Sequence, residues 1–205
     1  MVRDLVVILA GYLLGSIPFA YLVAKALARK DIRFEGDGNV GARNVRFAVG
    51  PRAGLLVLLL DMGKGAAAYW VAYCWASGRI VLYLTAVALF LGHGFPIWLR
   101  GRGGKGLSAA IGFLLQMWPW SMFGAALVFL VAGRLIAGFS VPFGIASAAF
   151  SLFTLLEGSR PEDLAFIVCF LGLAGIKKAI DRRHERQVQA RTGYAEEPPR
   201  FRWTG

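Results

Sequence analysis

The chain has 205 residues, of which 57% are hydrophobic and only 17% are charged. Soluble domains carry roughly 45–50% apolar and about 25% charged residues, and a chain of this size cannot bury such an excess in one core. This hydrophobicity excludes intrinsic disorder, and the presence of only two cysteines excludes a disulfide framework. The composition therefore predicts an all-α polytopic membrane protein.

Basic residues are in excess, because 23 Lys and Arg face 12 Asp and Glu, a net charge of +11. Nucleic acid, an anionic membrane face and anionic substrates are the partners that such an excess suits. The basic residues lie between apolar runs instead of forming one stripe on a soluble domain. We therefore expect membrane lipids and anionic substrates as partners, and no nucleic acid.

The first apolar run is Leu5–Leu27, and it is long enough to cross a bilayer. We expect an uncleaved span here and not a signal peptide, because the preceding residues are nearly neutral and GSIPF, residues 15–19, stands in place of a terminal cleavage site. Six further apolar stretches are Ala53–Ala76 with a polar interruption, Ile80–Gly92, Leu107–Met117, Trp120–Gly133, Leu135–Leu156 and Leu164–Ile176. Residues 1–180 are predicted to form one integral membrane domain, and 181–205 a basic cytoplasmic tail with a disordered end.

The distribution of Lys and Arg predicts the orientation. Six lie in residues 29–52, three in 98–106 and eight from Lys177 onward, whereas 157–163 and the region of Arg79 hold one each. Basic connections stay on the cytoplasmic side of a membrane. About seven transmembrane helices are expected, with the N-terminus outside and the C-terminus cytoplasmic.

The first polar segment with chemical potential is GDGNVGARNVR, residues 36–46. Closely spaced glycines allow backbone N–H groups to turn toward an anion, and the Asn and Arg side chains add donors. A solvated cytoplasmic loop is the alternative interpretation.

The second segment is DMGKG, residues 61–65, within the apolar stretch that begins at Ala53. Charges at membrane depth are costly, so they are either functional or mutually compensating. Asp61 and Lys64 are three residues apart and can pair on one helical face. A purely structural ion pair is the alternative.

The third segment, residues 92–106, ends in GGKG and leads directly into an apolar run. A helix N-terminus beside a cation suits an anion, although the Ser or Thr of a P-loop is missing after Lys105. The alternatives are an interfacial turn and, for His93, a packing role. Neither His93 nor His184 has metal-ligand spacing, so neither a metal nor a cofactor is expected.

Together these motifs resemble the bacterial membrane family of acyl-phosphate:glycerol-3-phosphate acyltransferases, over nearly the whole chain. Residues 15–22 resemble the first span of that family, 36–44 its G-S-G-N-x-G-A-T-N loop, 61–65 its D-x-x-K-G motif, and 92–112 its G-H-x-F-P…G-G-K-G motif. The resemblance implies seven helices in the bacterial cell (plasma/inner) membrane, an active site on the cytoplasmic side, and no obligate protein partner. It implies a role in phospholipid synthesis: acyl transfer from acyl phosphate to the sn-1 hydroxyl of glycerol 3-phosphate, giving lysophosphatidic acid.

The resemblance also nominates site residues. The candidate catalytic residues are Asp37, Arg43, Lys105 and His93. The candidate substrate-binding residues are Gly38, Asn39, Asn44, Arg46, Asp61, Lys64, Gly103, Gly104, Gly106, Ser140, Arg183 and Arg186. Acyl phosphate is already an activated mixed anhydride, so these residues would orient two phosphates and stabilise developing charge.

Several positions depart from the pattern of this family. Asp37 replaces a Ser, Arg43 a Thr and Phe47 an Arg. If a helix begins here, positions 43 and 47 share a face, so Arg43 can supply the missing guanidinium, whereas Arg46 points elsewhere.

Further departures fall in the second half of the chain: Ala137 replaces a Ser, with Ser140 nearby, and Arg183 and Arg186 replace a His and an Asn. Two alternatives follow from the departures and the basic loops: a diverged homologue with another anionic acceptor or no activity, and a non-enzymatic anion or lipid transporter.

Overall fold

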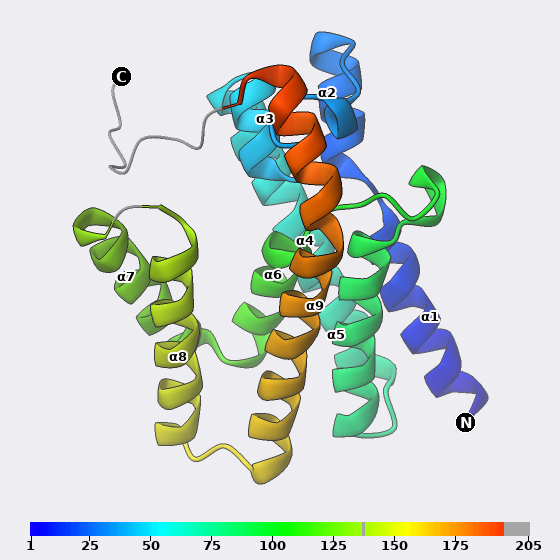
Figure 1. Ribbon diagram of the computed structural model, residues 1–205. Helices are drawn as coiled ribbons and strands as arrows, with labels where there is room; N and C mark the ends of the chain where they lie inside the picture. The colour runs from blue at the N-terminus through cyan, green and yellow to red at the C-terminus, as the bar shows by residue number, and fades with distance from the viewer. Residues whose placement is uncertain (137, 195–205) are drawn as a thin grey trace. The chain divides into compact units, whose positions relative to one another are not determined.

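The computed structural model describes residues 1–136 and 138–194, which form helices and the loops between them without any strand (Figure 1). The α-helices are α1 (Val2–Ser16), α2 (Phe19–Ala28), α3 (Ala42–Ala48), α4 (Pro51–Trp75), α5 (Arg79–Gly94), α6 (Leu107–Met117), α7 (Pro119–Leu135), α8 (Ser140–Leu156) and α9 (Pro161–Thr192). Two short 3-10 helices, η1 (Ile32–Phe34) and η2 (Ile97–Leu99), lie in the connections. The all-α prediction is confirmed. Ala137 and the end of the predicted tail lie outside the described residues.

Two compact units make up the described chain. The first contains residues 1–116 and 170–194, and the second contains residues 117–136 and 138–169. In the second unit α7 packs against α8, and the Ser121 hydroxyl donates a hydrogen bond to Glu157 over 2.7 Å. All candidate site residues except Ser140 belong to the first unit.

The first apolar run is interrupted in the structure. α1 ends at Ser16 and α2 begins at Phe19, with Ile17 in an extended conformation (φ −63°, ψ 113°). Pro18 explains the interruption, because proline disfavours the helical conformation of the residue before it and lacks an N–H donor. The interruption leaves carbonyl oxygens without helical partners in the middle of an apolar segment.

Glycines allow the helices of the first unit to touch at the backbone. A Cβ atom on Gly15 of α1 would lie 2.1 Å from the Leu89 carbonyl oxygen of α5. A Cβ atom on Gly65 of α4 would lie 2.0 Å from the Ala109 carbonyl oxygen of α6. Small residues at helix contacts are typical of membrane bundles, where close van der Waals packing drives association.

Three helical segments of the described chain are long and apolar enough to cross a membrane, judged by length and composition: Val2–Ala28, Pro51–Trp75 and Arg79–Leu99. α6, α7 and α8 are shorter apolar helices. Large apolar side chains on α1 and α4, such as Leu9 and Leu59, are exposed and suit contact with lipid. The number of seven spans and their orientation stay predictions.

Candidate functional site

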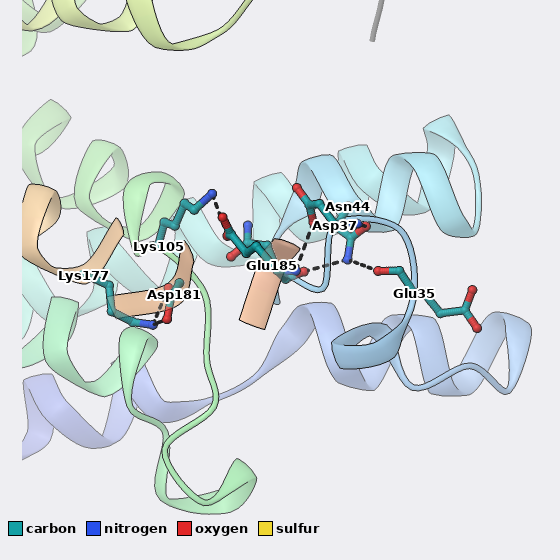
Figure 2. A network of polar contacts seen from close by, with 8 residues as sticks. Glu35, Asp37, Asn44, Lys105, Lys177, Asp181 and Glu185 are labelled. Carbon is teal, nitrogen blue, oxygen red and sulfur yellow. Dashed lines mark hydrogen bonds and ion pairs between the residues drawn. The ribbon is translucent and has the colours of Figure 1, made fainter. Parts of the chain in front are cut away.

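Asn44 organises the loop between α2 and α3. Its side chain is fully buried, and its carbonyl oxygen accepts a hydrogen bond from the Asp37 N–H over 3.1 Å. Its amide nitrogen lies 2.9 Å from the carbonyl oxygen of Glu35 (Figure 2). It also lies 3.1 and 2.9 Å from the carbonyl oxygens of Ile32 and Asn39. Because these backbone groups use both amide hydrogens, Asn44 shapes the loop in this structure instead of presenting a donor to a ligand.

Asp37 lies in that loop with its carboxylate buried. Its Oδ1 atom accepts a hydrogen bond from the Asn39 N–H over 3.0 Å. Burial raises the pKa of Asp37 above its usual value, against the opposing influence of the Asn39 hydrogen bond and of the positive charges on Lys105 and Arg43. The negative charge of Glu185 raises the pKa further. Asp37, Arg43, Lys105 and Glu185 therefore form one electrostatic group.

Lys105 extends from the glycine-rich loop that precedes α6. The loop is attached to the end of α5, because the Gly103 N–H donates to the Gly94 carbonyl over 3.2 Å and the Gly104 N–H to the His93 carbonyl over 3.1 Å. Gly106 has a φ of +73°, a conformation that favours glycine, and α6 starts at the next residue. The prediction that GGKG opens a helix is confirmed.

The ammonium of Lys105 pairs with a carboxylate of α9, which sequence analysis did not identify. The Nζ atom lies 2.8 Å from Oε1 of Glu185, and both side chains are mostly buried (Figure 2). Lys177, Asp181 and Glu185 follow one another at four-residue intervals and so lie on one face of α9. Lys177 pairs with Asp181. This spacing is the sequence signal that could have identified the three residues.

Two other side chains of α9 attach this helix to the connection between α2 and α3. His184 Nε2 lies 3.1 Å from the Arg33 carbonyl oxygen, and the Thr192 hydroxyl donates to the Gly36 carbonyl over 2.7 Å. Arg183 and Arg186, by contrast, are exposed on α9, beside Arg182 and Gln187. The structure thus brings Glu185 to Lys105, and it places the two predicted arginines on an exposed part of the helix.

The predicted pairing of Asp61 with Lys64 is confirmed inside α4. Lys64 Nζ lies 2.8 Å from Asp61 Oδ1, and both side chains are almost completely buried. Lys64 Nζ also donates to the carbonyl oxygens of Gly15 and Ile17, over 3.1 and 2.8 Å. His93 Nδ1 lies 3.8 Å from the same Asp61 oxygen. The helix α4 continues through the polar residues 61–65 because the charges of Asp61 and Lys64 neutralise each other.

Residues 42–48 form the helix α3. A helix here is what Arg43 needs if its guanidinium is to replace the one missing at Phe47. Arg43 and Arg46 are half-buried, and the exposed Phe47 packs edge-on against Tyr194, with ring centroids 4.6 Å apart. Ser140 is the first residue of α8, in the second unit. The site roles of Arg46 and Ser140 stay predictions.

The described residues contain no cluster of three or more His, Cys, Asp or Glu side chains that could hold a metal ion. The first unit instead gathers cations, carboxylates and glycine-rich backbone at the connections of α2–α3 and α5–α6. Such a site can bind and orient phosphate groups and accept a proton at Asp37.

The chain matches proteins of known family over most of its length. A family model described as glycerol-3-phosphate acyltransferase matches residues 5–190. A glycerol-3-phosphate acyltransferase 1 of Dehalococcoides mccartyi is 41% identical over 184 residues, which cover 86% of this chain and 88% of that protein. A glycerol-3-phosphate acyltransferase of Anaeromyxobacter sp. is 40% identical over 135 residues, 64% of this chain and 66% of that relative. A relative from Cereibacter sphaeroides is 49% identical over 110 residues, 54% of its length.

Two crystal structures of PlsY, an integral membrane glycerol 3-phosphate acyltransferase, have the same fold. The glycerol 3-phosphate form has a TM-score of 0.80 and 30% identity, and the alignment covers 95% of this chain and 94% of that one. The lysophosphatidic acid form has a TM-score of 0.77 and 28% identity, with the same coverage. This chain therefore belongs to the glycerol-3-phosphate acyltransferase family of integral, multi-pass membrane enzymes.

Proposed function

We propose that this enzyme transfers a fatty acyl group from acyl phosphate to the sn-1 hydroxyl of glycerol 3-phosphate, releasing lysophosphatidic acid and inorganic phosphate. The observation that carries the proposal is the ion pair between Lys105, in the glycine-rich loop, and Glu185 of α9, with the charges of Lys105, Glu185 and Arg43 all acting on the buried Asp37. We place this site at the cytoplasmic side of a bacterial cell membrane, with seven spans and an external N-terminus.

The chemistry suits the residues. The acceptor hydroxyl oxygen attacks the acyl carbon, a new C–O ester bond forms, and the C–O bond to phosphate breaks. The hydroxyl proton passes to the Asp37 carboxylate, whose raised pKa makes it a stronger base than an exposed aspartate. Lys105 and Arg43 offset the negative charge of the departing phosphate, and the N–H groups of the glycine loop orient it.

The reaction can be tested with purified protein. Release of inorganic phosphate from palmitoyl phosphate is expected only when glycerol 3-phosphate is present, together with formation of lysophosphatidic acid. Lys105→Gln should abolish this release while the protein remains folded. Arg102→Gln is the matched control, because Arg102 is exposed in the same loop and should tolerate the loss of its charge. Folded wild-type protein without phosphate release would refute the proposal.

A different acceptor is a second candidate function, because Lys105 already pairs with the Glu185 carboxylate and interacts electrostatically with that of Asp37. Negative charge beside Lys105 opposes an anionic acceptor and favours a neutral one. Phosphate release with glycerol exceeding that with glycerol 3-phosphate would support this candidate.

A further inference from the structure

The ammonium of Lys64 is surrounded by three protein oxygens: it donates hydrogen bonds to two carbonyl groups and forms an ion pair with a carboxylate. Gly15 O, Ile17 O and Asp61 Oδ1 lie 3.1, 2.8 and 2.8 Å from Nζ. An ammonium has three donors and no acceptor. A substrate phosphate would therefore have to compete with these buried partners for Lys64, and leaving a buried partner unpaired is costly.

Two of these acceptors belong to the interruption between α1 and α2. The carbonyl oxygens of Gly15 and Ile17 lack their helical N–H partners because α1 ends at Ser16, and Ile17 accepts only the Phe19 N–H of the described backbone, over 3.1 Å. Within an apolar segment such oxygens need a partner. Lys64 supplies it from α4 and thereby fixes the position of the interruption.

A second set of contacts connects the Asp61–Lys64 pair with the glycine-rich loop that carries Lys105. Asp61 faces His93 Nδ1 over 3.8 Å, and the His93 carbonyl oxygen accepts the Gly104 N–H. A Cβ on Gly104 would lie 2.5 Å from His93 Nε2 and 2.2 Å from the Val40 carbonyl oxygen. The imidazole of His93 therefore lies between the Asp61–Lys64 ion pair of α4, the loop between α2 and α3, and Gly104, the residue preceding Lys105.

A small cavity joins the same segments. It is lined by residues of the interruption, including Ser16, and by Val40, His93 and Gly103. The Ser16 hydroxyl and His93 Nδ1 are buried there, and neither has a hydrogen-bond partner among residues 1–136 and 138–194. Displacement of the interruption or of His93 would consequently be transmitted to the loop that carries Lys105.

We infer that Lys64, Asp61 and His93 are positioning residues, which hold the interrupted first span and the glycine-rich loop in register, and that Lys64 does not bind substrate. The inference differs from the sequence-based assignment of Lys64 and Asp61 to substrate binding and of His93 to catalysis. It rests on the proposed function for its kinetic test, and on the three contacts of Lys64 for its structural test.

The experiment compares Lys64→Gln with the double variant Lys64→Gln/Asp61→Asn in the purified full-length protein. In the single variant Asp61 is a buried charge without its cation, so the melting temperature and kcat should both fall, kcat by about tenfold or more. The KM for glycerol 3-phosphate should stay within about threefold, because no substrate contact is lost. The double variant removes both charges and keeps two amides, so it should recover most of the lost melting temperature and kcat.

Lys105→Gln serves as the comparison for a residue that does contact substrate, and Asp61→Asn should not restore its activity. The inference is overturned if Lys64→Gln raises KM as Lys105→Gln does, or if Asp61→Asn rescues neither property of Lys64→Gln. The melting temperatures distinguish a failure of this inference from a failure of the proposed function. They report on the buried pair even if the wild type releases no phosphate.

Discussion

Replacing Glu185 by Gln should strengthen the binding of glycerol 3-phosphate. The carboxylate lies 2.8 Å from Lys105 Nζ, with 13% of the Glu185 side chain and 27% of the Lys105 side chain exposed. A substrate phosphate that binds Lys105 must therefore compete with a carboxylate that already occupies it. Gln keeps the shape of Glu185 and removes the charge.

The size of the effect follows from the geometry. A phosphate at Lys105 would have its charge about 4 Å from the Glu185 carboxylate, and two like charges at that separation repel by about 1 kcal/mol in water and about 4 kcal/mol at an effective dielectric constant of 20. Partial exposure and salt reduce the upper value, which leaves about 1–2 kcal/mol. The KM for glycerol 3-phosphate should therefore fall roughly 5- to 30-fold.

The assay is phosphate release from palmitoyl phosphate at varied glycerol 3-phosphate and constant ionic strength. Glu162→Gln is the matched control, because it removes the same charge from an exposed position near the start of α9 and should leave KM unchanged. An unchanged or higher KM for Glu185→Gln, in a protein with wild-type melting temperature, would show that Glu185 does not compete with the phosphate.

Three further predictions concern the first unit. If Asp37 is the base, kcat/KM should rise with pH through the raised pKa of Asp37 and then level off, because only the deprotonated carboxylate accepts a proton. Asp37→Ser should remove this acidic limb from the pH–rate profile. Asn44→Ala should lower the free energy of unfolding in detergent by about 2–4 kcal/mol, because it leaves the buried backbone groups around it unpaired. Gly65→Ala should lower the free energy of unfolding by about 1–3 kcal/mol, because its Cβ would lie 2.0 Å from the Ala109 carbonyl oxygen. Gly63→Ala is the control and should be tolerated, because a Cβ there has open space around it.

Local patterns predicted the parts of the structure that depend on near neighbours. The i,i+3 spacing of Asp61 and Lys64 predicted their ion pair, and the glycines before Leu107 predicted the start of a helix. These features depend on helical geometry and on backbone conformation within a few residues, so the sequence contains the information directly.

The partners across the fold could not be predicted in the same way. Lys64 reaches the carbonyl oxygens of Gly15 and Ile17, 49 and 47 positions earlier in the chain, because Pro18 interrupts a run that reads as one continuous span. Glu185 reaches Lys105 because α9 continues as a helix to Thr192, through a segment whose charge indicated a tail. Tertiary packing, which supplies apolar contacts such as Val188 against Gly38, extends the helix beyond its apolar part.

The charges around Lys105 are best understood as a set. Asp37 and Glu185 contribute two negative charges, and Lys105 and Arg43 two positive ones, so the group is balanced before any substrate arrives. Under the proposed function, a substrate phosphate would replace a carboxylate as the partner of a cation, and its affinity would be the difference between two ion pairs. Mutations of the carboxylates should for this reason alter acceptor affinity as strongly as mutations of the cations, with the opposite sign.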